Sequence, residues 1–151
     1  MNALRNSLRF LLGRRPSALQ VAAICRNAAG EVLLITSRGT GRWVIPKGWP
    51  MAGRSLAGAA AQEAWEEAGI RGTIGEDEIG RFTYDKDQDE GFAVSVEVRV
   101  FLLEATGQSR DFPEARERRA RWFAPAEAAK LVAEPGLSRI LGGLSLPRAD
   151  A

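Results

Sequence analysis

The feature that most constrains this chain is a helix-forming stretch, residues 55–70, in which three glutamates recur at helical spacing. Glu63 meets Glu66 three positions later and Glu67 four positions later, so all three would share one face of a helix. Like charges at these spacings cost about 0.2–0.5 kcal/mol per pair, and the helix dipole disfavours anions in the last turn. No Lys or Arg lies within one turn on that face. The sequence therefore predicts a bound cation, and oxygen-only ligands suit Mg²⁺ or Mn²⁺.

Both ends of this helix carry local signals. Ser55 is a favourable N-cap residue, and Gly69 suits the left-handed position that closes a helix. We expect the side opposite the glutamates to pack, because it carries Ala57, Ala61, Ala64, Trp65 and Ala68. The alternative is a solvated helix whose acidic stripe arose by chance.

The residues before the helix make a longer pattern. A strand-like run, residues 42–45, leads into Pro46, Lys47 and Gly48, and the helix follows. This ordering resembles the Nudix hydrolases. Their box reads Gly, five residues, Glu, seven residues, Arg-Glu, an apolar residue, any residue, Glu-Glu, any residue, Gly and an apolar residue. The positions that match in register are Gly48, Glu63, Glu66, Glu67, Gly69 and Ile70, with Ala64 as a small apolar residue.

Two positions depart from the box. Arg54 stands where the family has its first Glu, and Gln62 stands where it has Arg. The family's Arg helps to hold the neighbouring catalytic glutamate, whereas Gln62 can form hydrogen bonds but carries no charge. Arg54 either contacts a substrate phosphate or is simply solvated. Because the metal-binding glutamates are retained, the resemblance still implies an active enzyme.

Composition narrows the range of functions. A chain of 151 residues with 45% apolar and 26% charged residues is typical of one globular domain. The net charge of +2 gives no support for nucleic-acid binding. The single cysteine, Cys25, lies in an apolar run and fits a buried strand in a reducing, cytoplasmic environment. The absence of histidine excludes His-based catalysis and argues against a zinc site.

The two ends of the chain differ from its middle. No apolar run reaches the roughly 20 residues that span a membrane, so we expect no membrane partner. Residues 1–16 form a basic segment without acids, which predicts an amphipathic helix or tail docked on the domain, although it also resembles a transit peptide.

We expect the hydrolase domain at 17–145 and a C-terminal tail at 146–151. The sequence leaves the oligomeric state open between monomer and homodimer.

Alternating apolar runs and turn signals predict the order of the elements. We expect strands at 19–26, 31–36, 42–45, 71–74, 79–84, 92–104 and 119–123, a polar loop at 85–91, and helices at 125–132 and 137–141. The fold class is α/β, and the pattern agrees with a Nudix-type α/β/α sandwich with a mixed β-sheet.

Within the family, three segments look most like the diphosphoinositol polyphosphate hydrolases and their diadenosine polyphosphate-cleaving relatives: residues 43–50, 67–72 and 119–123. The resemblance implies Mg²⁺-dependent (or Mn²⁺-dependent) cleavage of a diphosphate linkage in a small polyphosphorylated substrate. The alternative, motivated by Arg54 and Gln62, is a non-catalytic module that binds such a ligand.

The resemblance also assigns roles. The metal ligands would be the Gly48 carbonyl, Glu63, Glu66 and Glu67, and the catalytic base would be Glu63 or Glu67. Asp89, Glu90 and Glu97 are further candidates for the base, although Glu97 also fits an ordinary outward-facing strand residue. Arg38, Arg42 and Lys47 are expected to bind substrate phosphates, since they flank the metal-binding segment. Trp43 and Trp49 could stack on a base, with Trp43 fitting the core better.

Overall fold

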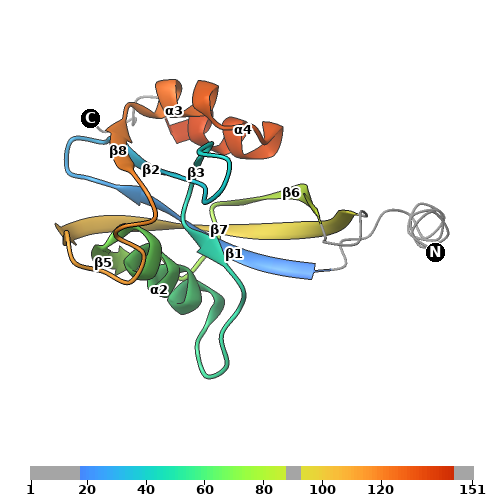
Figure 1. The fold of residues 1–151 in the computed structure, drawn as a ribbon, viewed down its shortest axis with the longest axis horizontal. Helices are drawn as coiled ribbons and strands as arrows, with labels where there is room; N and C mark the ends of the chain where they lie inside the picture. Colours follow the sequence, from blue (N-terminus) through green and yellow to red (C-terminus); the bar gives the residue numbers. More distant parts are fainter. Residues whose placement is uncertain (1–17, 88–92, 145–151) are drawn as a thin grey trace, which may run out of the picture.

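An eight-stranded mixed sheet forms the centre of the computed structural model, which describes residues 18–87 and 93–144 (Figure 1). The central order is β3-β2-β1-β7-β5, with β4 on β1, β6 on β7 and β8 on β2. The β1–β7 pair is parallel and the other pairs are antiparallel. The strands are β1 (Ala18–Arg26), β2 (Val32–Thr36), β3 (Trp43–Val44), β4 (Lys47–Gly48), β5 (Ile70–Ile74), β6 (Gly80–Asp87), β7 (Ala93–Gln108) and β8 (Ala120–Phe123).

Helices cover both faces of this sheet. Helix α2 (Leu56–Ala68) lies on one face, and α3 (Pro125–Leu131) and α4 (Pro135–Leu144) lie on the other (Figure 1). Each helix layer encloses its own apolar core against the sheet. The expected α/β/α sandwich with a mixed sheet is confirmed. Among the helices of the described segments, none is long and apolar enough to span a lipid bilayer.

Strand β1 is the central element of both cores. Val21 and Cys25 face α2, whereas Ala22 and Ile24 face α3 and α4, and all four are fully buried. A strand covered on both faces reads as a continuous apolar run, as the sequence does here. Burial raises the pKa of the Cys25 thiol to about 12, and the expected position of Cys25 in a buried strand is confirmed.

Most element positions agree with the sequence-based expectations, and the differences have structural causes. The expected loop at 85–91 begins later, because β6 continues to pair with β7 through Asp87. Strand β7 extends to Gln108 because β5 pairs along its last residues. Strand β4 was not predicted, and α4 is longer at both ends than expected. The expectations for residues 1–16 and 146–151, and for Asp89 and Glu90, lie outside the described residues.

Candidate metal and phosphate site

The two ends of α2 are fixed by the residues that the sequence indicated. The Ser55 side chain accepts a hydrogen bond from the Gly58 N–H at 3.0 Å. Gly69 ends the helix in the left-handed conformation, with φ at 69°, and its N–H donates to the Trp65 carbonyl at 3.0 Å. These caps determine where α2 begins and ends.

The orientation of α2 differs from the prediction. Glu63 and Glu67 are buried, with only 9% and 7% of their surfaces exposed, and they share the inward face with Ala60 and Ala64. The expected division into one packing face and one acidic face is therefore wrong. Glu66 is half-buried, and the Gln62 Nε2 donates to its Oε2 at 2.8 Å. Two of the three glutamates thus lie inside the molecule, where an uncompensated charge is costly.

Gly48 makes room for one of these carboxylates. Strand β4 places Gly48 opposite Val21 of β1, on the side that faces α2. A Cβ atom at residue 48 would overlap the Glu63 carboxylate. Only glycine allows this close approach, which brings the backbone of β4 and the Glu63 carboxylate together.

Burial and mutual repulsion change the acidity of the pair. Burial, a hydrogen bond with Glu67 and the charges of Glu67, Glu66 and Glu114 together raise the pKa of Glu63 to about 8. Burial also raises the pKa of Glu67, against the opposing effects of the hydrogen bond from Glu63 and the charge of Arg118. Burial of two like charges in one site therefore favours the protonated form of the pair.

A cation that the sequence analysis missed lies beside the pair. Arg118 Nη2 is 3.7 Å from Glu67 Oε1 and 2.9 Å from Glu114 Oε1, and its Nη1 donates to the Thr36 carbonyl at 3.0 Å. Its side chain is only 9% exposed. As the sequence indicated, no basic residue lies in the last turn of α2, but Arg118 offsets the charge of Glu67 from a segment that is distant in the chain. The only available signal was the arginine-rich run at 116–121.

The donor set suits a metal that keeps some of its water. Among the described side chains, no three His, Cys, Asp or Glu residues converge on one point. Mg²⁺ binds through one or two carboxylates plus waters and substrate phosphates, rather than inside an all-protein cage. The buried Glu63 and Glu67, with the backbone of Gly48 beside them, fit that requirement.

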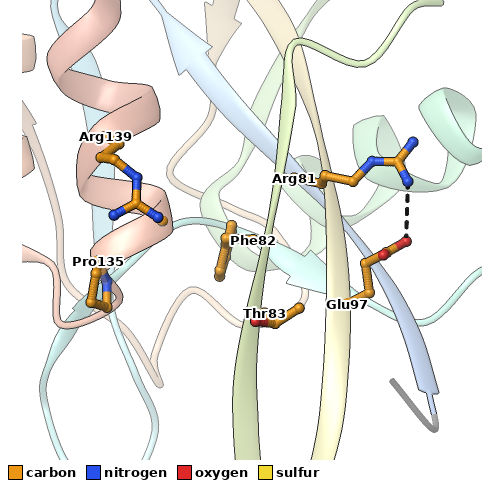
Figure 2. A pocket seen from close by; sticks show the side chains of 7 residues that line it. Arg81, Phe82, Thr83, Glu97, Pro135 and Arg139 are labelled. Atoms are coloured by element: carbon orange, nitrogen blue, oxygen red, sulfur yellow. Dashed lines mark ion pairs between the residues drawn. The ribbon is translucent and has the colours of Figure 1, made fainter. Parts of the chain in front are cut away.

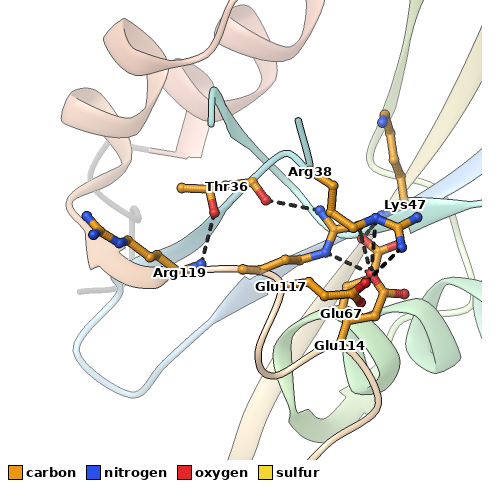
Figure 3. A network of polar contacts seen from close by, with 8 residues as sticks. Thr36, Arg38, Lys47, Glu67, Glu114, Glu117 and Arg119 are labelled. Carbon is orange, nitrogen blue, oxygen red and sulfur yellow. Dashed lines mark hydrogen bonds and ion pairs between the residues drawn. The ribbon is translucent and has the colours of Figure 1, made fainter. Parts of the chain in front are cut away.

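An arginine-rich pocket of about 440 Å³ lies next to Arg118. Arg38 contributes to it and pairs with Glu114 at 3.8 Å and with Glu117 at 3.5 Å, as Figure 3 shows. Thr36, Ser37, Arg38, Gly39, Gly41, Arg116, Glu117, Arg118 and Arg119 line this arginine pocket. The arginine pocket therefore lies between Arg38, which is predicted to bind phosphate, and Arg118, which pairs with Glu67.

The backbone and the side chain of Lys47, in β4, make contacts in different directions. Its backbone N–H donates to Glu67 Oε1 at 3.3 Å, while its side chain points away from that carboxylate (Figure 3). The Lys47 Nζ lies 5.2 Å from the centre of the Tyr84 ring. Arg42 is exposed and interacts electrostatically with Tyr84. Lys47 and Arg42 thus place their charges near Tyr84, whereas Arg38 lines the arginine pocket.

The structure also shows the positions of the remaining candidate residues, which are Glu97, Trp43, Trp49 and Arg54. Glu97 pairs with Arg81 at 3.6 Å and with Arg99 at 3.3 Å, and it borders a cavity of about 370 Å³ beside the start of α4 (Figure 2). These pairs fit an ordinary surface strand residue. Trp43 packs edge-on against Phe123 with ring centres 5.2 Å apart, which places it in the core. Trp49 and Arg54 are both exposed.

Comparison with known proteins gives the family. The model of the NUDIX domain matches residues 16–141, which include Gly48 and the glutamates of α2. The chain belongs to the Nudix family. The expectation of a Nudix pyrophosphohydrolase is thereby confirmed at the level of the family.

Among Nudix relatives, the chain is 29% identical over 147 residues to Nudix hydrolase 12, mitochondrial, of Arabidopsis thaliana, covering 90% of this chain and 72% of the relative. It is 34% identical over 103 residues to human diphosphoinositol polyphosphate phosphohydrolase 3-beta, covering 68% of this chain and 60% of the relative's length. The C. elegans Ap4A hydrolase structure superposes with a TM-score of 0.57 at 23% identity, covering 85% and 94% of the two chains. The structure of a MutT protein from Bacillus halodurans superposes with a TM-score of 0.63, also at 23% identity, and the match covers 86% of this chain and 84% of that one.

Proposed function

We propose that this chain is a Mg²⁺-dependent hydrolase that cleaves a diphosphate linkage in a diphosphoinositol polyphosphate or a dinucleoside polyphosphate. The observation that carries the proposal is the buried Glu63–Glu67 pair, packed against Gly48 and bordered through Arg118 by the arginine pocket. The proposal is also supported by the human diphosphoinositol polyphosphate relative and the structural likeness to an Ap4A hydrolase.

The reaction needs a water to attack phosphorus while the bridging P–O bond breaks and the leaving phosphate departs. A divalent ion at this site would neutralise phosphate charge and lower the pKa of water. Glu67 is fixed by the Lys47 N–H and by Arg118, which suits a ligand that must stay in place. Glu63 faces Gly48, and no ion pair holds it among the described residues. Glu63 is therefore the better placed of the two to take the proton from water.

The arginine pocket would bind the phosphates that are not cleaved. Arginine presents a planar fork of donors that matches phosphate oxygens. In the described structure, Arg38 pairs with Glu117 on the surface, and such an exposed pair contributes little stability. A phosphate can therefore replace Glu117 at small cost.

Turnover provides the test. Purified protein with Mg²⁺ is incubated with diadenosine tetraphosphate and with a diphosphoinositol polyphosphate, and the products are followed by ³¹P NMR. We expect cleavage of at least one substrate, abolition by a chelator, and a loss of about hundredfold or more in Glu67→Gln. The exposed Glu76→Gln is the matched control and should retain full activity. Cleavage of neither substrate above the Glu67→Gln background contradicts the proposal.

A non-catalytic binding module is the second candidate, because Arg54 is exposed and Gln62 replaces the family's Arg. The contacts of Gln62 with Glu66 and of Arg118 with Glu67 supply part of what the box arginine provides, which favours an enzyme. Gln62→Arg separates the two candidates: an enzyme keeps or gains turnover. A binding module stays inactive with either residue and binds polyphosphate equally well in a chelator.

A further inference from the structure

Arg118 contacts its three partners at unequal distances. Its Nε and Nη2 atoms both lie 2.9 Å from Glu114 Oε1, and its Nη1 donates to the Thr36 carbonyl at 3.0 Å. The distance from Nη2 to Glu67 Oε1 is 3.7 Å, which is beyond the range of a hydrogen bond. Arg118 therefore lies near enough to offset the charge of Glu67, while its guanidinium forms hydrogen bonds with Glu114 and Thr36.

The backbone fixes Glu114 beside helix α2. Glu114 belongs to the segment between β7 and β8, and its N–H donates to the Glu66 carbonyl at 3.0 Å. Its own carbonyl accepts the Glu117 N–H at 3.0 Å, so the chain turns here. This turn brings Arg118, four positions after Glu114, back to the Glu114 carboxylate, whose side chain is only 19% exposed. The position of Arg118 is thereby tied to the helix that carries Glu67.

A divalent ion and an arginine compete for the same carboxylate oxygens. An arginine that binds a carboxylate with two parallel hydrogen bonds engages both oxygens, whereas a metal needs an oxygen that is free to coordinate it. Glu67 Oε1 already accepts the Lys47 N–H at 3.3 Å. In the described structure, the acidic partners of Arg118 are Glu114 and Glu67. An Arg118 that lost Glu114 would therefore move onto Glu67 and compete with the metal.

We propose that Glu114 is a positioning residue that holds Arg118 away from the Glu67 oxygens, so that Glu67 can bind a divalent ion while part of its charge stays balanced. This inference rests on the proposed function, because that function assigns Glu67 to the metal. The last turn of α2 carries no basic residue. Arg118 supplies a positive charge from a distant segment, and Glu114 determines how close this charge comes to Glu67.

Mn²⁺ binding in the absence of substrate tests the inference separately from turnover. Electron paramagnetic resonance of free Mn²⁺ gives the dissociation constants of the unchanged protein, Glu114→Gln, Arg118→Met and the double variant. We expect Glu114→Gln to weaken Mn²⁺ binding about tenfold, because Arg118 then pairs with Glu67. In the Arg118→Met background, the same substitution should change the affinity by less than about threefold, since no arginine remains to compete. Asp111→Asn removes an exposed acid from the same segment and is the matched control, with unchanged affinity.

A crystal structure of metal-free Glu114→Gln is a second measurement, and it does not depend on whether Arg118→Met folds. It should show Arg118 within about 3 Å of a Glu67 oxygen.

Three results would overturn the inference. An equal loss of Mn²⁺ affinity from Glu114→Gln in both backgrounds would make Glu114 only a negative charge near the metal. An Arg118 that keeps its distance from Glu67 in the variant structure would show that Glu114 does not hold it. A protein that binds no Mn²⁺ would remove the metal site itself. Turnover is scored separately: if neither polyphosphate substrate is cleaved, the hydrolase proposal fails, while the Mn²⁺ comparison still decides the role of Glu114.

Discussion

At the scale of single residues, Arg118 compensates two carboxylates at once. It contacts Glu67 and Glu114 and donates to the Thr36 carbonyl from a nearly buried position. Removing one partner from such a group leaves the others charged and unpaired, which costs about 3–5 kcal/mol. We therefore expect Arg118→Met to lower the free energy of unfolding by about 3 kcal/mol, measured by urea denaturation. The exposed Arg116→Met should change it by less than about 0.5 kcal/mol, and equal effects of the two variants would contradict this account.

Gly48 is the second residue with a specific geometric role. A methyl group at this position would push the Glu63 carboxylate aside rather than the backbone, because the overlapping atoms are at the end of a flexible side chain. We expect Gly48→Ala to fold normally and to lose about hundredfold in kcat/KM, the typical effect of a 1 Å displacement in a catalytic group. Gly107→Ala is the control, since a Cβ there meets nothing within 4 Å. Full activity of Gly48→Ala would show that the close approach is unimportant.

At the scale of elements, the end of α2 depends on the backbone of Gly69. Its φ of 69° is unfavourable for other residues, and a Cβ would collide with the Ser109 carbonyl and the Phe112 ring. Gly69→Ala should therefore lower the stability by about 2 kcal/mol. Gly143→Ala in α4 meets open space at an ordinary helical φ, and it should raise the stability by up to about 1 kcal/mol. Thermal unfolding of the two variants checks the opposite signs.

Local chemistry explains which elements could be predicted from the sequence. Ser55 and Gly69 act on their own helix, and Asn27 caps its own turn by accepting the N–H groups of Ala29 and Glu31, so short windows contain these signals. Strand β4 could not be predicted, because it has only two residues and exists through its pairing with β1. The length of β7 likewise depends on partners that are distant in sequence.

The same distinction, between signals contained in a short window and contacts between distant residues, applies to the candidate site. The spacing of Gly48, Glu63 and Glu67 was readable because the box lies in one continuous segment. Arg118 was not, since it reaches the site from a distant loop whose path is determined by tertiary packing. The inward rotation of Glu63 and Glu67 was also missed, because helical periodicity alone assigns charged residues to the outside.

At the scale of the whole molecule, the glutamate pair connects stability to pH and metal. The pKa of Glu63 is about 8 in the folded protein and near 4.5 in an unfolded chain. Between these values the folded state binds more protons, so its stability falls as the pH rises. We expect the melting temperature in EDTA to decrease from pH 5.5 to 8.5, and Mg²⁺ to raise it more at pH 8.5 than at pH 5.5, because metal and protons compete.

Glu63→Gln provides the control for this linkage. Without the titrating group, the melting temperature in EDTA should vary much less over the same pH interval, and the stabilisation by Mg²⁺ should shrink. A pH profile of Glu63→Gln that superposes on that of the unchanged protein would assign the dependence to other groups.

The burial of Cys25 gives this molecule an internal reporter of its own opening. The thiol lies fully buried in the central strand β1, where its raised pKa keeps it protonated. A thiol reagent can reach it only after β1 separates from its neighbours, and the chain has no second cysteine to compete. The labelling rate of the unmodified protein therefore measures how often the whole sheet comes apart, with no probe to introduce.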